Sequence, residues 1–448
     1  MGFMQKRLSL LSFCRVALCL VTSLVVLTGC GTSSPSSGPA VLRIWYSTDD
    51  PVERTWSQEL ASQFQQTHPA VQVRMVDYSF EDLNTKLQLA LQAGTPPDLA
   101  YVTPRGPGIP AYLGAHKLRD LTTAARSGSW TSKLRPGLLA GYNQPFGFMG
   151  ARQGAVMAVP TSLAAVGVLY NKDLLARLHL PLPSSIGAFE RALTRAKATG
   201  YTPIGMGNAD GWLGDDWYLT LVNALASPHQ LAPEFSLSRQ FSFRQQPFVQ
   251  AAAILRRWSQ RGYFTQDFGG LDAQEGIDQF FHGRTLFQLI SSSENPQIQQ
   301  DQQQTGLPIG VFAFPGMHGG SIIPVSGYLG WVVPTAGRHP RQAIAFIDSL
   351  LAPSTTRLLM RHGVLPAATA LATPNTGTGW QQEYRVALDT AQPGVYLDAA
   401  PVANLNATME ANVQLLLQGY EGPDFLVKSL QEDYTSHKGS TARIDGEF

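Results

Sequence analysis

Two tryptophans and three aspartates stand close together in the glycine-punctuated stretch GNADGWLGDDW, residues 207–217. A carboxylate accepts charged hydrogen bonds, which are about twice as strong as neutral ones, and an indole face packs against apolar C–H surfaces. This combination suits a small ligand with hydroxyl groups beside apolar faces. We expect Trp212 and Asp216 to contact such a ligand. Trp217 begins the apolar run WYLTLVNALA and is expected to point into the core.

Polar residues also follow two predicted strands near the N-terminus. Asp49 and Asp50 come after LRIWY, and Thr103 and Arg105 come after DLAYV. Ligands of parallel sheets bind beyond the carboxyl ends of the strands, so these four residues are candidate ligand contacts. Each has an ordinary alternative. Asp50 can cap the helix that starts at Pro51, Asp49 can lie in a solvated loop, and the other two can serve in a turn.

Alternating strands and helices must position these residues. In the first hundred residues, apolar spacing predicts a strand, a helix, a strand, a helix and a strand in turn, at 42–46, 51–67, 71–75, 80–93 and 98–102. This alternation predicts a parallel sheet with right-handed crossovers.

The same alternation resumes after Pro160. Strands are predicted at 166–170, 201–207, 285–290, 309–316 and 328–334, and helices at 186–199, 249–261, 341–351 and 404–420. The stretch GMHGGSIIPVSG, residues 316–327, is interpreted as a glycine-rich loop.

The N-terminus has the pattern of a targeting segment. Residues 1–29 carry three basic residues and no acidic one, and the 14 mostly apolar residues VALCLVTSLVVLTG precede Cys30. That run is shorter than the roughly 20 residues of a membrane-spanning helix and suits a signal peptide. LTGC looks like a bacterial lipobox, in which Cys30 would carry lipid; an ordinary secretory signal with an incidental cysteine is the alternative. Residues 30–40 then suit a flexible tether.

Charge and cysteine usage exclude several classes of function. Without residues 1–29 the chain has 30 basic and 32 acidic residues, a net charge of −2, and no basic stripe that would favour nucleic acid. Its remaining cysteine is Cys30, so no disulfide forms within the chain and no further thiol serves catalysis. The 9 His residues are dispersed without metal-ligand spacing. We therefore expect no metal and no cofactor.

Enzymatic motifs are absent from the sequence. Gly205-Met206-Gly207 followed by Gly211 is a near miss to a nucleotide-binding loop and is better explained as a loop bend. No G-x-S-x-G, H-E-x-x-H or P-loop pattern occurs. The adjacent Asp215 and Asp216 could serve glycoside hydrolysis, but adjacency does not specify the separation that two catalytic carboxylates need. A binding protein is favoured over an enzyme.

Five stretches resemble, in the same order, the extracellular solute-binding lipoproteins of ABC importers, a group that includes sugar-binding proteins. They are ALQAGTPPDLAYV, AVPTS…VLYNKDLL, FFHGRTLF, FAFPG and GYLGWVVP…HPRQAIAFIDSLL. The resemblance covers most of residues 27–435. It implies an α/β, two-lobed periplasmic-binding-protein-like fold of type II. The discontinuous lobes would be 41–158 plus 306–352 and 159–305 plus 353–448, joined by crossing strands that act as a hinge.

The resemblance also implies a function and partners. The chain would be a monomeric receptor on the extracytoplasmic face of a bacterial membrane, anchored by lipid on Cys30. It would hold a small polar solute, most of all a sugar or polyol, between its lobes and deliver it to the transmembrane permease subunits of an ABC transporter. A surface receptor that senses the solute without transport is the alternative, and a carbohydrate-active hydrolase is a less favoured one.

Two further candidate contacts lie later in the chain. Ser293 stands where some family members place an aromatic platform, and Tyr328 follows the glycine-rich loop and could line the cleft; Trp331 is expected to pack within its strand. The segment after the first crossing offers only Ser162 as a polar group, and the last long helix shows asparagines, not an aromatic residue. These departures disfavour stacking of a long oligosaccharide and leave a monosaccharide, polyol or other small polar solute.

Overall fold

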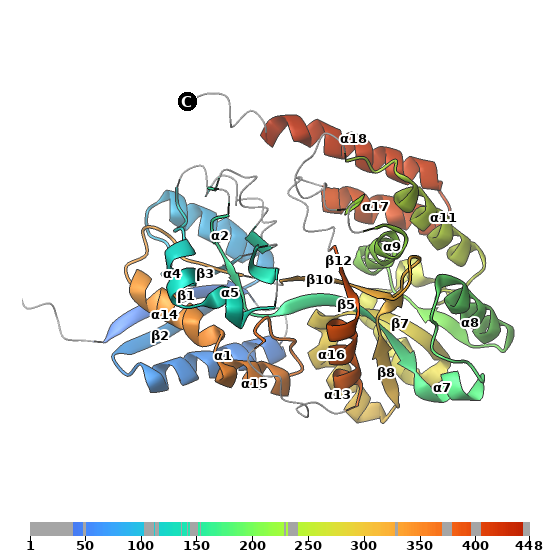
Figure 1. Cartoon of the computed structure of the whole chain (residues 1–448), viewed down its shortest axis with the longest axis horizontal. Coiled ribbons are helices and arrows are strands. Elements are labelled where there is room, and N and C mark those ends of the chain that lie inside the picture. Colours follow the sequence, from blue (N-terminus) through green and yellow to red (C-terminus); the bar gives the residue numbers. More distant parts are fainter. Residues whose placement is uncertain are drawn as a thin grey trace, which may run out of the picture. The chain divides into compact units, whose positions relative to one another are not determined.

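The computed structural model describes residues 39–47, 51–102, 112, 116–135, 137–140, 142–143, 151–152, 154–227, 230–231, 241–327, 330–369, 379–395 and 405–441. Strands within these residues form two sheets, each covered by helices (Figure 1). The first has five strands in the order β2-β1-β3-β11-β4. The second has seven, in the order β12-β10-β5-β7-β6, with β8 paired to β5 and β9 to β10. The two-lobed α/β fold expected from the sequence is therefore confirmed.

The first lobe is built mainly from the N-terminal part of the chain. Its strands are β1 (Ala40–Ser47), β2 (Val71–Tyr78), β3 (Leu99–Val102), β4 (Val159–Pro160) and β11 (Gly330–Val332). Its helices are α1 (Pro51–Thr67), α2 (Phe80–Gln92), α4 (Thr122–Ser127), α5 (Trp130–Lys133), α14 (Pro340–Leu350) and α15 (Pro353–Arg361).

The strand–helix alternation near the N-terminus folds as predicted. β1 pairs in parallel with both β2 and β3. The four-residue spacing on α1 buries Trp56, Leu60 and Phe64 in the core beside the sheet. Ser79 caps α2 by accepting a hydrogen bond from the Asp82 backbone N–H, which satisfies a group that a helix start leaves without an intrahelical partner.

Asp98 ties the start of β3 to two other elements. Its buried carboxylate accepts hydrogen bonds from the backbone N–H groups of Arg43 at 2.9 Å, Arg338 at 2.7 Å and His339 at 2.9 Å. Arg43 lies in β1, and the other two residues lead into α14. One carboxylate therefore positions the sheet and a helix that covers it.

Asp98→Ala is expected to lower the free energy of unfolding by about 3 kcal/mol, because it leaves three buried backbone donors without their acceptor. Urea denaturation measures the loss. Asp82→Ala is the matched control, since its side chain is 59% exposed, and it should change stability by less than about 0.5 kcal/mol. Equal effects of the two substitutions would contradict this role for Asp98.

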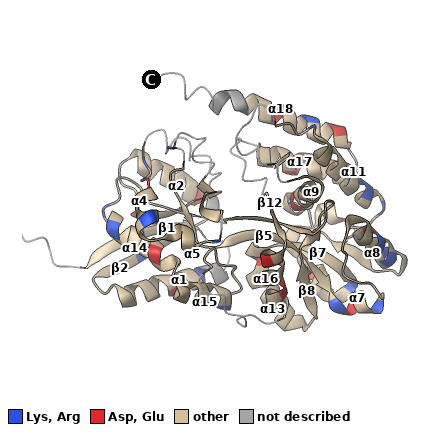
Figure 2. Cartoon of the chain, in the orientation of Figure 1, with Lys and Arg blue, Asp and Glu red and all other residues tan. Residues whose placement is uncertain are grey.

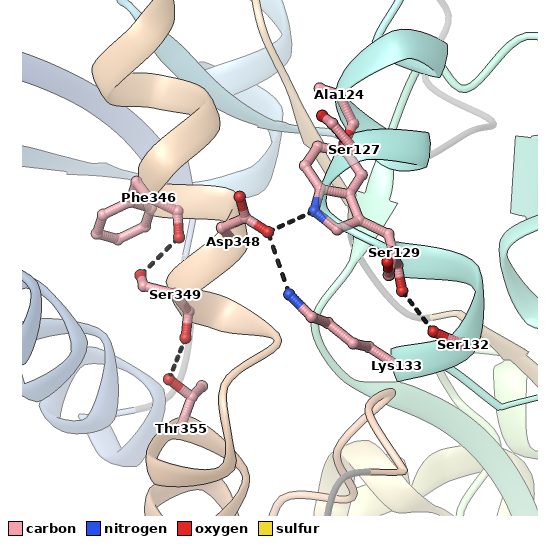
Figure 3. A network of polar contacts seen from close by, with 10 residues as sticks. Ala124, Ser127, Ser129, Ser132, Lys133, Phe346, Asp348, Ser349 and Thr355 are labelled. Carbon is pink, nitrogen blue, oxygen red and sulfur yellow. Dashed lines mark hydrogen bonds and ion pairs between the residues drawn. The ribbon is translucent and has the colours of Figure 1, made fainter.

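A second polar network joins α5 to α14 (Figure 3). Asp348 accepts hydrogen bonds from the Trp130 indole Nε1 at 2.6 Å and from Lys133 Nζ at 3.3 Å. The Trp130 ring is fully buried, so its polar edge needs such a partner. This network fixes α5 against a helix that lies more than 200 residues later in the sequence.

The second lobe is built from the middle and the C-terminal part of the chain. Its strands are β5 (Leu163–Asn171), β6 (Thr202–Gly205), β7 (Thr285–Ser291), β8 (Ile309–Phe312), β9 (Phe314–Pro315), β10 (Ser321–Gly327) and β12 (Gln392–Gly394). Its α-helices are α7 (Lys172–Arg177), α8 (Ile186–Ala198), α9 (Trp212–Leu225), α11 (Gln246–Gln260), α12 (Ala273–Gln279), α13 (Asn295–Thr305), α16 (Trp380–Thr390), α17 (Leu405–Gln418) and α18 (Pro423–Thr441). Short 3₁₀ or π turns occupy η1 (Phe268–Gly270), η2 (Phe280–Arg284) and η3 (Ser292–Glu294).

Trp217 stands at the centre of the second core, as predicted. Its ring is fully buried and packs against those of Phe189, Trp258 and Phe314, with centroid separations of 5.9, 5.6 and 6.0 Å. The prediction for Trp331 is confirmed too: it is buried in the first core and stacks on Tyr101.

The glycine-rich loop predicted at 316–327 is wrong over most of its length. Residues 321–327 form β10, which pairs with β9 and β5. Only 316–320 form the turn of the hairpin, where Gly319 and Gly320 take positive φ values of 89° and 74°. The glycines therefore mark the turn, while the β-branched residues after them extend into a strand.

The lobe segments expected from the sequence differ from the observed pairing. β8, β9 and β10 all belong to the seven-stranded sheet, although residues 306–352 were assigned to the first lobe. Helix α15, assigned to the second lobe, packs into the first core through Leu358 and Leu359. The sequence motifs locate these elements, but they do not specify which strand or core each one joins.

The charged residues and the apolar helices are further features of the two-lobed fold. Figure 2 shows Lys, Arg, Asp and Glu positions interspersed along the described helices. Among the described residues, no single helix has both the length and the apolar character needed to cross a membrane. Helices α14 and α15 reach that length and composition only when taken together, and they are bent by 62° with respect to each other.

Candidate functional site

The carboxyl ends of the parallel strands define one edge of each sheet. In the first sheet β4 runs in the same direction as β1, β2 and β3, because β11 is antiparallel to both β3 and β4. In the second sheet β6, β7, β10 and β12 share a direction, because β5 is antiparallel to β7 and β10. Loops beyond such edges are where α/β sheets bind ligands.

The chain passes between the sheets at these edges. β4 ends at Pro160 in the first sheet and β5 begins at Leu163 in the second, and β10 ends at Gly327 before β11 begins at Gly330. The two crossings are hydrogen-bonded, since 163–165 pair antiparallel with 325–327. The carboxyl edges of both sheets therefore adjoin the same two crossings.

A third segment reinforces the crossings. The Leu163 N–H donates to Leu365 O at 2.9 Å, and the Ala367 N–H donates to Thr161 O at 2.9 Å. Between them, Ser162 and Pro366 form an isolated antiparallel β-bridge. Leu365 packs against the cores of both lobes, as does Val325 of β10. Among the described residues, short hydrogen-bonded segments thus join the lobes, as a hinge between two lobes would require.

A serine-rich turn follows β7 at the carboxyl edge of the second sheet. Glu294 accepts a hydrogen bond from the Ser291 N–H at 2.8 Å, and the Ser291 hydroxyl accepts one from the Glu294 backbone, which makes a capping box. The Ser293 hydroxyl donates to Glu294 Oε1 at 2.6 Å. The turn is thus held by its own side chains.

The same turn is bonded to a crossing. Ser292 Oγ accepts from the Ala165 N–H at 3.0 Å and donates to Leu163 O at 2.7 Å, both at the start of β5. Ser292 is buried. A side chain beside the candidate site therefore contacts the strand that leaves the first lobe.

Two carboxyl groups, those of Glu294 and Asp216, and the phenol of Tyr384 lie near this turn. Removal from water raises the pKa of Glu294 from 4.5 to about 7, although the hydrogen bonds from Ser293 and Ser291 favour the ionised form. Burial raises the pKa of Tyr384 well above 10, and the charges of Glu294 and Asp216 raise it further. Asp216, in the second turn of α9, is itself buried. Side chains from η3, α9 and α16 thus converge at this edge.

The raised pKa has a consequence for stability. The folded chain binds the Glu294 proton more tightly than the unfolded chain does, so this contribution to stability is present below pH 4.5 and is lost as the pH rises to about 7.

The loop after β6 forms the neighbouring part of the edge. A Cβ on Gly207 would lie 1.7 Å from Asp272 O, so the backbones approach too closely for any side chain. Asn208 Oδ1 accepts from the Gly214 N–H at 2.6 Å, and Gln414 of α17 donates to Asn208 O at 2.7 Å. The glycines of this stretch therefore form a tightly packed loop bend, as expected. The resemblance of Gly205-Met206-Gly207 to a nucleotide-binding loop is explained by this close backbone packing.

Trp212 is the first residue of α9, directly after that loop. Its indole Nε1 donates to Asp210 Oδ2 at 3.1 Å, its ring is partly exposed, and its inner side packs against the second core. Asp210 is exposed. A half-buried indole with a fixed ring plane at a sheet edge can offer an apolar face to a ligand.

A family model for bacterial extracellular solute-binding proteins matches residues 49–356. The chain belongs to this family. It is therefore a solute-binding protein and not an enzyme. Among the described residues of this solute-binding protein, no group of three or more His, Cys, Asp or Glu side chains is placed to hold a metal ion.

Individual relatives agree with the family. The multiple sugar-binding protein of Streptococcus mutans is 22% identical over 311 residues, which cover 68% of this chain and 69% of the relative. A chitin oligosaccharide binding protein has a similar structure, with a TM-score of 0.74 and 20% identity over 90% of this chain and 99% of that one. The apo form of RafE from Streptococcus pneumoniae gives a TM-score of 0.73 and 22% identity over 90% and 99% of the two chains. These structures support the fold.

The structure of this solute-binding protein describes three of the predicted contacts. All three lie beyond the carboxyl edge of the second sheet: Trp212 is the first residue of α9, Asp216 lies in the second turn of that helix, and Ser293 lies in the turn after β7. The remaining predicted site residues lie outside the described residues: Asp49, Asp50, Thr103, Arg105, Tyr328 and the proposed lipid-bearing Cys30. Residues 30–38 of the predicted tether lie outside them too.

Sequence reasoning missed Glu294, Ser292 and Tyr384. The signal for Glu294 was present, because Ser291 and Glu294 have the S-x-x-E spacing of a capping box. Tyr384 gave no such signal, because it reaches this edge from a helix about 90 residues further along the chain and only packing brings it there.

Proposed function

We propose that this solute-binding protein captures a sugar or another small polyhydroxylated solute and delivers it to the permease of an ABC importer. The observation that carries the proposal is the pair of hydrogen-bonded crossings, β4–β5 with β10–β11, which adjoin the carboxyl edges of both sheets. A solute held at these edges would contact both lobes, and rotation about the crossings would enclose it. We place the lobes at 40–160 plus 330–367 and at 163–327 plus 379–441.

The groups at the second edge support a polyhydroxylated solute. The Asp216 carboxylate and the Ser293 hydroxyl can bond hydroxyl groups, and the exposed part of the Trp212 ring can cover a C–H face. Relatives support the same class, since the Streptococcus mutans protein is described as a multiple sugar-binding protein. Asp49, Asp50, Thr103, Arg105 and Tyr328 are proposed as the contacts from the first lobe and the second crossing.

Thermal unfolding tests the proposal. The chain without residues 1–30 is heated with each member of a panel of galactose, melibiose, raffinose, chitin oligosaccharides, polyols, amino acids and glycerophosphodiesters. A solute present at about 100 times its Kd stabilises the folded state by about 2.7 kcal/mol, so one class of sugar or polyol should raise the Tm by several degrees. A shift with amino acids alone, or with no panel member, would contradict the proposal.

Lipid anchoring is the second part of the proposal and rests on LTGC before the tether. Full-length chain expressed in a bacterium should incorporate an alkyne-labelled fatty acid and partition into the detergent phase. Cys30→Ser should lose both properties. Cys19→Ser is the matched control, because Cys19 lies within the predicted signal peptide and its loss should leave labelling intact. Labelling of the Cys30→Ser chain would contradict lipid attachment at this residue.

A further inference from the structure

The turn after β7 links an ionisable carboxyl to a hydroxyl that stands at the proposed solute site. Ser293 Oγ donates its only proton to Glu294 Oε1 at 2.6 Å, and the other carboxyl oxygen, Oε2, accepts from the Ser291 N–H at 2.8 Å. With Glu294 ionised, Ser293 therefore offers a solute only the lone pairs of its oxygen.

Protonation of Glu294 reverses this polarity. Because Oε2 receives a backbone N–H, the added proton belongs on Oε1, where it can be donated to Ser293 Oγ. The Ser293 proton is then released and can be donated to a solute oxygen or to Ser291 Oγ, which lies 3.0 Å away. The serine changes from an acceptor into a donor without movement of the backbone.

The surroundings favour the protonated form. The charged or titratable groups that face this turn are Asp216 from α9 and Tyr384 from α16, and the charges of Glu294 and Asp216 both raise the pKa of Tyr384. Strand β5 presents only apolar side chains and backbone at Leu163–Ala165, and Asp301, further along α13, accepts a hydrogen bond from Gln297. None of these described elements supplies a cation to Glu294. Burial accordingly raises the pKa of Glu294 to about 7.

We propose that Glu294 is a positioning residue that couples proton uptake to solute binding, by setting whether Ser293 donates or accepts at the solute. This inference rests on the proposed function. A bound solute would cover the partly exposed turn and remove water from Glu294, which disfavours the ionised carboxylate. Binding therefore takes up a proton, and affinity falls as the pH rises through 7.

The experiment has a solute arm and an arm that needs no solute. In the first, Kd is measured at pH 6 and pH 8 by titration calorimetry with raffinose, melibiose, galactose and chitin oligosaccharide. The wild-type chain should bind a panel sugar about fivefold more weakly at pH 8. Glu294→Gln should bind within about twofold of the wild-type value at pH 6 at both pH values, because its amide can donate to Ser293 and accept from Ser291 as the protonated acid does.

The second arm titrates Glu294 in the free protein by ¹³C NMR, with the carboxyl signal assigned by its loss in Glu294→Gln. A midpoint near 7 supports the inference, and one near the ordinary value of about 4.3 overturns it.

Asp424→Asn, on an exposed part of α18, is the control and should keep the wild-type pH dependence of sugar binding. Sugar binding that is equally tight at pH 6 and pH 8 overturns this inference but leaves the proposed function standing. Failure of every panel sugar to bind contradicts the proposed function, and the NMR midpoint then decides the protonation of Glu294.

Discussion

Trp217→Ala is expected to lower the free energy of unfolding by about 4 kcal/mol, because it removes a fully buried indole from a cluster of three other aromatic rings. Trp212→Ala, five residues earlier, should cost about 1 kcal/mol or less, because its ring is partly exposed. Trp212→Ala should also weaken sugar binding about tenfold, which corresponds to about 1.4 kcal/mol. Urea denaturation and calorimetry measure the two effects.

The comparison is informative because the two tryptophans lie on one helix and differ in surroundings. The structure assigns one to the core and the other to the edge of the sheet. Similar stability losses for both variants would refute that assignment. Wild-type sugar affinity in the Trp212→Ala chain would show that Trp212 does not contact the sugar.

Asp216→Asn is expected to weaken sugar binding about 20-fold or more. Asparagine keeps the shape of the side chain but loses the charge, and a hydrogen bond to a charged group contributes about 1.5 to 3 kcal/mol. Asp216 is buried in the second turn of α9, close enough to Tyr384 for its charge to raise the pKa of that phenol. Its carboxylate therefore acts where water competes little.

Asp210→Asn is the matched control for Asp216→Asn. Asp210 lies at the same edge but is exposed and bonded to the Trp212 indole, so its replacement should change affinity less than about threefold. Equal losses for the two variants would indicate a general effect of charge at this edge and would contradict a specific contact by Asp216.

Local patterns predicted most of the elements in this chain. The four-residue apolar spacing of α1, the Ser79 cap of α2 and the buried position of Trp217 were all readable from residues near one another in sequence. The fold class followed from motifs whose order matches the family. Prediction failed where the outcome depends on pairing: β10 was interpreted as a loop because its glycine-rich start masked the strand that pairs with β5.

The candidate site was predictable only in part, for a related reason. Trp212 and Asp216 were found from the cluster of tryptophans and aspartates in one short stretch, and Ser293 from its position in the motif order of the family. Tyr384 and the Ser292 bond to β5 depend on contacts between segments more than 90 residues apart, which no local pattern encodes. Glu294 carried a readable capping signal, but its raised pKa arises from burial and could come only from the structure.

The central claim is that two lobes close on a sugar by rotation about the crossings. The chain without residues 1–30 contains no cysteine, so Leu89→Cys and Tyr420→Cys, both at exposed positions, place one spin label on each lobe. The distance between the labels is measured by pulsed electron resonance with and without the sugar that raises the Tm. A shorter and narrower distance distribution with sugar is expected; an unchanged distribution at saturating sugar would contradict closure.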